Sequence, residues 1–144
     1  MQNIAAGLLR AAGVLLIALG LVHLVATPHI PALLHGCPAA VYGRAVGPTL
    51  LNHVLVGILL LPLGYATWLA AGRQERGKVW AKRVLIANTL VMLTLPASLV
   101  VFMRRAEYFT SPLFLIGVGL VAVVSLLMAV ATFIVSRVPS PSGE

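Results

Sequence analysis

The chain has 144 residues, of which 60% are hydrophobic and only 9% are charged, and its mean hydropathy is +1.05. A soluble domain carries about 25% charged residues, so this composition excludes a water-soluble globular protein and predicts a chain that resides in a lipid bilayer. Ten Lys and Arg against three Asp and Glu give a net charge of +7. The basic residues lie between apolar segments, where membrane topology explains them without a nucleic-acid partner.

Four long apolar runs follow one another, and each predicts a transmembrane helix. They cover about residues 8–26, 49–71, 84–103 and 113–135. Each has the roughly 20 residues that cross ~30 Å of hydrocarbon, and backbone groups in lipid must be satisfied within the segment, so helices are expected rather than strands. We therefore predict an all-α integral membrane protein, an up-down antiparallel four-helix bundle forming one domain over residues 1–138. A short disordered tail, 139–144, follows it.

The distribution of Lys and Arg predicts the orientation. If both termini are cytoplasmic, seven basic residues lie inside and three lie outside, namely Arg44, Arg104 and Arg105. The positive-inside rule favours this arrangement. We predict a multi-pass protein of a bacterial-type inner (plasma) membrane, with its N-terminus and C-terminus cytoplasmic and its first connection on the periplasmic or outer side.

The first connection, residues 27–48, is long for a helical bundle and contains four prolines. Connections of this length without structure of their own tend to be functional, so we expect an outer loop here, with at most a short interfacial helix over residues 39–46. The second connection, residues 72–83, is basic. Trp68 and Trp80 flank it as expected interfacial anchors.

Histidines concentrate at the outer side. His23 lies one turn before the predicted end of the first span, and His53 lies one turn after the start of the second. At 1.5 Å per residue both are about 6 Å inside the outer boundary. Antiparallel neighbours would place the two imidazoles at one level, below a connection that contains His29 and His35.

This cluster predicts a metal or haem site. Imidazole is a common ligand of zinc, copper and iron, and two imidazoles from facing helices could also hold haem b. We expect His23 and His53 as primary ligands of the metal or cofactor, with His29 or His35 completing the set. Two further residues, Cys37 and Glu107, are expected to support the ligands. The alternative is that these histidines only bind backbone carbonyls, lipid headgroups or solvent.

Missing residue types narrow the chemistry. No Asp or Glu lies within a predicted span, which excludes a carboxylate-bridged di-iron site in the bundle and argues against a proton-coupled carrier. The single cysteine cannot form an intrachain disulfide. Neither a P-loop nor a Ser-His-Asp arrangement is visible. Enzymatic activity is therefore undecided and would depend on the histidines and a cofactor.

Two further patterns concern helix packing. Pro62 and Pro96 fall near the middles of the second and third spans, where neighbouring helices can satisfy the freed carbonyls or where the kinks can open a cavity. The fourth run has a stripe of small residues that lets another helix approach closely. Its members are Gly119, Ala122, Ser125, Ala129 and Thr132. The partner of this face is another helix of the bundle, a second copy in a homo-oligomer, or a larger membrane complex.

Three functions remain open. The first is a small redox or metal-handling subunit that holds haem, copper, zinc or iron on the outer side. The second is a non-catalytic accessory subunit of a larger membrane complex. The third is a carrier or enzyme for a small lipophilic molecule, with a cavity at the two proline kinks.

Overall fold

The computed structural model describes residues 2–36, 38–74, 78–102 and 112–137, and within these ranges the chain is helical and contains no strand. The helices are α1 (Gln2–Ala26), the short 3₁₀ helix η1 (Thr27–His29), α2 (Ile30–Leu34), α3 (Ala39–Gln74), α4 (Val79–Phe102) and α5 (Pro112–Ser136). Four helical stretches in the described part are long and apolar enough to cross a membrane. The predictions of an all-α chain and of four apolar helices are therefore confirmed.

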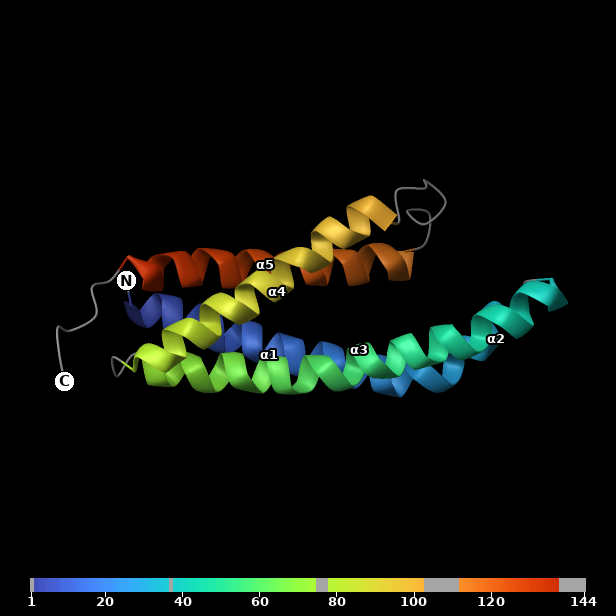
Figure 1. Ribbon diagram of the computed structural model, residues 1–144, viewed down its shortest axis with the longest axis horizontal. Helices are drawn as coiled ribbons and strands as arrows, with labels where there is room; N and C mark the ends of the chain where they lie inside the picture. Colours follow the sequence, from blue (N-terminus) through green and yellow to red (C-terminus); the bar gives the residue numbers. More distant parts are fainter. Residues whose placement is uncertain (1, 37, 75–77, 103–111, 138–144) are drawn as a thin grey trace.

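The chain reverses direction at each long helix, so that α1, α3, α4 and α5 alternate along the long axis (Figure 1). The most extensive contact joins α1 and α3, while α5 packs on both α4 and α1. The beginning of α1 and the end of α5 lie at the same end of the molecule (Figure 1). At the opposite end, α2 and the first part of α3 project beyond the other helices.

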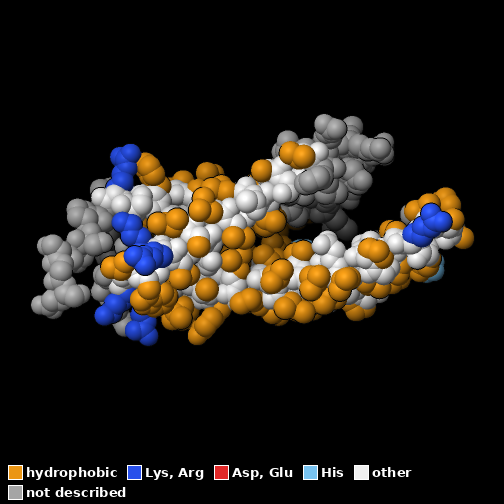
Figure 2. Space-filling view, viewed as in Figure 1, with side chains coloured by type: hydrophobic (Ala, Val, Ile, Leu, Met, Phe, Trp, Pro, Cys, Tyr) orange, Lys and Arg blue, Asp and Glu red, His pale blue; other side chains and the backbone are white. Residues whose placement is uncertain are grey.

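The surface is strongly apolar. Leu59, Val25 and Leu126 are each more than 60% exposed, and hydrophobic side chains cover the flanks of the helices (Figure 2). Most of the basic side chains in this view gather at the end where α1 begins and α5 ends (Figure 2). So large an apolar surface is unfavourable for a monomer in water, whereas it is compatible with contact to lipid.

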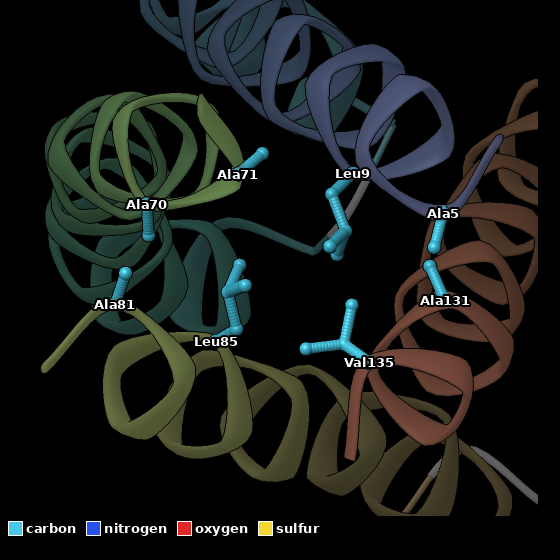
Figure 3. Close-up of a cluster of buried hydrophobic side chains, with 8 residues drawn as sticks. All are labelled: Ala5, Leu9, Ala70, Ala71, Ala81, Leu85, Ala131 and Val135. Carbon is cyan, nitrogen blue, oxygen red and sulfur yellow. The ribbon is translucent and has the colours of Figure 1, made fainter. Parts of the chain in front are cut away.

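The core is built largely from small side chains. One buried cluster joins all four long helices and consists of Ala5, Leu9, Ala70, Ala71, Ala81, Leu85, Ala131 and Val135 (Figure 3). A second cluster follows toward the other end and consists of Ala12, Leu16, Leu60, Met92, Val124 and Met128. Alanine lets helix backbones approach closely, which is how helices gain packing energy where lipid is as apolar as the core.

Two glycine pairs bring α1 and α3 into backbone contact. A Cβ on Gly64 would lie 2.6 Å from the carbonyl oxygen of Gly13, and a Cβ on Gly20 would lie 2.9 Å from that of Gly57. In each helix the two glycines are seven residues apart, so they repeat on one face over two turns. We call these four residues the glycine seam.

The prediction of an irregular loop over residues 27–48 is wrong. Helical structure continues from α1 through η1 and α2 to Leu34, and α3 begins at Ala39. Pro28 and Pro31 occupy first-turn positions of η1 and α2, where the missing N–H has no helical partner to lose. Pro38 precedes α3, and Pro48 is the one proline of residues 27–48 that lies in a helix interior. The first connection is therefore a helical arm.

Pro62 and Pro96 lie inside α3 and α4 without ending them. Pro96 cannot donate to the carbonyl four residues earlier, which belongs to Met92. The Ser125 hydroxyl of α5 donates to that carbonyl at 3.0 Å, and Ser125 is only 2% exposed. At this kink a neighbouring helix satisfies the freed backbone group, as one of the two sequence interpretations expected.

Ser125→Ala is therefore expected to destabilise the protein by about 1–2 kcal/mol, because it leaves the buried Met92 carbonyl without a donor. In a Pro96→Ala background the restored backbone N–H would take over this carbonyl, and Ser125→Ala should then cost clearly less. Equilibrium unfolding in detergent micelles measures all four proteins of this double-mutant cycle. Equal costs in both backgrounds would show that the hydroxyl does not compensate the proline.

One half of the small-residue stripe of α5 packs inside the bundle and the other half is exposed. Ser125 bonds to Met92 of α4, and the Thr132 hydroxyl lies 2.8 Å from that of Thr89 in α4. Ala129 is half-buried, whereas Gly119 and Ala122 are exposed. Only the half of the stripe around Gly119 and Ala122 thus remains free for a second copy or a larger complex, and that partner stays a prediction.

Candidate functional site

The two histidines of the first and second spans continue the core-facing positions of their helices. His23 follows Leu9 and Leu16 at intervals of seven residues, and both leucines are fully buried. His53 precedes Leu60 at the same interval, and Leu60 is 6% exposed. Residues seven apart share one helix face, so both imidazoles lie on the core-facing sides of α1 and α3, seven residues from Leu16 and Leu60.

The glycine seam brings these two side chains together. Gly20 lies three residues before His23, and Gly57 lies four residues after His53, so the close contact between these two glycines is about one turn from the histidine pair. The imidazole centroids are 4.6 Å apart and the ring planes are inclined by 31°. Both side chains are partly buried.

A hydrogen bond from Nδ1 to a backbone carbonyl defines the tautomer of each imidazole. His23 Nδ1 lies 3.0 Å from the carbonyl oxygen of Leu19, and His53 Nδ1 lies 2.9 Å from the carbonyl oxygen of His23. A carbonyl can only accept, so Nδ1 is the donor in each ring. In the neutral tautomer the Nε2 atoms then carry the free lone pairs. Histidines that ligate metals typically have this arrangement, with the second nitrogen bonded to a carbonyl.

Thr27 completes the local network. Its hydroxyl donates to the His23 carbonyl at 2.8 Å and lies 3.3 Å from His53 Nδ1. Thr27 therefore links the end of α1 to the imidazole of α3. This role was not expected from the sequence, although a threonine four residues after a histidine in a helix is placed to reach that histidine's carbonyl.

The other predicted ligands lie elsewhere. His29 is exposed and lines a shallow apolar recess of about 420 Å³ with Leu21, Val22, Val25 and Ala26. His35 is exposed at the end of the arm, where its ring stacks on Tyr42 with centroids 5.1 Å apart. Within the described residues no group of three or more His, Cys, Asp or Glu is close enough to hold a metal ion. Cys37 and Glu107 lie outside the described residues.

The ring spacing discriminates between possible ligands. If both Nε2 atoms faced one ion with metal–nitrogen bonds of about 2.0 Å, each ring centroid would lie about 3.2 Å from it, and the 4.6 Å spacing would correspond to an angle of roughly 90–95° at the metal. This angle suits neighbouring positions on one ion. Haem iron between two axial imidazoles would need centroids about 6 Å apart. The observed spacing is therefore shorter than two axial ligands of one haem iron would need.

Comparison with protein-family models, with curated proteins and with solved structures gives no match for this chain.

Proposed function

We propose that the protein spans a membrane and binds one transition-metal ion, copper, zinc or iron, through His23 and His53. The observation that carries the proposal is the pair of imidazoles 4.6 Å apart, each with Nδ1 bonded to a backbone carbonyl. Nitrogen ligands of this kind suit these metals. Ionisable side chains within apolar spans are candidates for a functional role.

The proposed orientation has the metal site near the outer surface. Basic side chains gather at the end where α1 begins and α3 and α5 end (Figure 2), whereas His23 lies near the end of α1 and His53 in the first half of α3. The positive-inside rule assigns the basic end to the cytoplasm. Both termini are then cytoplasmic, and the helical arm extends on the periplasmic or outer side. At 1.5 Å per residue the 36 residues of α3 measure about 54 Å, which exceeds the ~30 Å hydrocarbon layer.

The proposed metal site has open coordination positions. Two imidazoles fill half of the usual four-coordinate shell of zinc, and neither His29 nor His35 is among the donors. Water or a ligand from outside would fill the other positions. Such a site suits the exchange of a metal ion, or chemistry at the ion, better than a purely structural role. This is the metal-handling function, and it leaves enzymatic activity undecided.

Replacement of the histidines by asparagine separates ligation from structure. The asparagine amide nitrogen can occupy the place of Nδ1 and donate to the same carbonyl, but no ligand remains at Nε2. We expect His23→Asn and His53→Asn each to lower the affinity for Zn²⁺ or Cu²⁺ by at least ~100-fold. Isothermal titration of untagged, metal-free protein in detergent, with elemental analysis of the protein as isolated, provides the measurement.

The matched control is His35→Asn, which removes an exposed imidazole of the arm and should leave the affinity unchanged. Equal affinity in wild type, His23→Asn and His53→Asn would contradict the proposed site. A wild-type protein that binds none of the metals and co-purifies with other membrane proteins would instead favour the non-catalytic accessory subunit.

A further inference from the structure

A group of basic side chains lies at one end of the helices, opposite the histidine pair. It consists of Arg73 at the end of α3, Lys82 and Arg83 in the first turns of α4, and Arg137 just after α5. We call these four residues the basic collar. Arg73, Arg83 and Arg137 are exposed, and Lys82 is half-buried.

Hydrogen bonds between helices show that the collar lies at one level. Asn88 of α4 donates to the Thr67 hydroxyl of α3 at 3.0 Å. Because the two helices are antiparallel, Arg73, six residues after Thr67, lies level with Lys82, six residues before Asn88. Lys82 in turn donates to the backbone carbonyl of Ser136 at 3.0 Å, which brings the end of α5 and the adjacent Arg137 to the same level.

The positive charge of the collar has no acidic partner among the described residues, which contain neither Asp nor Glu. In the whole sequence, seven Lys and Arg belong to this end of the predicted topology, against Glu75 and Glu144. Arg137 also makes a cation–π contact, with its guanidinium 4.2 Å from the centre of the Phe133 ring. The net charge of this end is therefore strongly positive and attracts anions.

Aromatic side chains mark the membrane boundary beside the collar. Trp68 and Trp80 are 45% and 47% exposed, and half-exposed tryptophans sit at the headgroup level of a bilayer. Trp68 lies five residues before Arg73 in α3, and Trp80 lies two residues before Lys82 in α4. The collar is thereby held at the depth of the phosphates, where guanidinium groups bind phosphate oxygens in pairs.

We propose that the basic collar binds the phosphate groups of anionic phospholipids in the adjacent leaflet. Four cations on three helices can contact more than one phosphate, so lipids with two phosphates should bind more tightly than lipids with one. The bound headgroups would join the ends of α3, α4 and α5 at the level of the collar. This lipid site and the metal site lie at opposite ends of the helices, so either one can fail without the other.

The test uses the full chain in zwitterionic detergent micelles, to which phosphatidylglycerol, diphosphatidylglycerol or phosphatidylcholine is added while the midpoint of thermal unfolding is followed. We expect stabilisation by the two anionic lipids and not by phosphatidylcholine. Near a surface, each Lys or Arg changes the affinity for anionic lipid by about fivefold. Arg73→Gln together with Arg83→Gln should therefore raise the half-saturating concentration by roughly 25-fold.

Two control variants complete the design. Arg44→Gln removes an exposed arginine in the arm at the far end of α3 and should leave the response to lipid unchanged. Arg73→Lys with Arg83→Lys keeps the charge and should retain most of the affinity. Equal stabilisation by phosphatidylcholine, an unaltered response of the Gln variant, or the same effect from inorganic phosphate alone would each overturn the proposal.

Discussion

Gly64→Ala is expected to lower the free energy of unfolding by about 2 kcal/mol. The new methyl group would lie 2.6 Å from the Gly13 carbonyl oxygen and 2.9 Å from the backbone nitrogen of Ile17. Backbone atoms cannot rotate away as side chains can, so α1 and α3 must separate. Such overpacking costs about 1–3 kcal/mol or more, which exceeds the ~1 kcal/mol that alanine gains in helix propensity.

Gly7→Ala is the matched control for Gly64→Ala. Gly7 also lies within a long helix, but a Cβ there would meet no atom within 4 Å, so this variant should be neutral or slightly more stable. Equilibrium unfolding of both variants in detergent micelles gives the comparison. If Gly64→Ala were as stable as Gly7→Ala, the close contact between α1 and α3 would be refuted.

Gly20→Ala is expected to separate α1 and α3 close to the histidine pair. Its Cβ would lie 2.9 Å from the Gly57 carbonyl oxygen, about one turn from His23. Separation of the helices at this level would lengthen the contact between the two imidazoles. The glycine seam thus sets the geometry of the site as well as the stability of the fold.

The second large effect concerns stabilisation by metal. If His23 and His53 bind one ion, the ion cross-links α1 and α3, and a metal concentration 100 times the dissociation constant should stabilise the wild type by about 2.7 kcal/mol. His53→Asn keeps a donor for the His23 carbonyl but lacks Nε2, so its stability should not respond to metal. Unfolding of both proteins with added Zn²⁺ or with a chelator measures the difference.

A contrasting variant tests whether the network around the pair supports ligation. Thr27→Val removes the hydroxyl that lies 3.3 Å from His53 Nδ1 but leaves both imidazoles in place. Its stabilisation by metal should be weaker than that of the wild type, since partners that orient ligands affect affinity by about 10–100-fold. Stabilisation by metal that is equal in wild type and His53→Asn would locate the ion elsewhere.

The four helices could be predicted because their signal is local. Each apolar run is long enough to satisfy its own backbone hydrogen bonds in lipid, and the centres of all four helices lie where hydropathy puts them. The sequence predicts a loop where the arm lies, because a proline-rich composition is typical of loops. Pro28 and Pro31 lie in first turns, where proline is compatible with a helix, and composition alone does not reveal that position.

Sequence by itself determined the four long apolar helices, that His23 and His53 share one level, and that the charges separate toward the ends. These properties depend on residue type and on 1.5 Å of rise per residue. Only the tertiary structure decided that the two imidazoles meet, that His29 and His35 lie apart from them, and that Ser125 compensates Pro96. Those facts depend on how far each helix is rotated about its axis, and glycine-to-backbone contacts between α1 and α3 set that rotation.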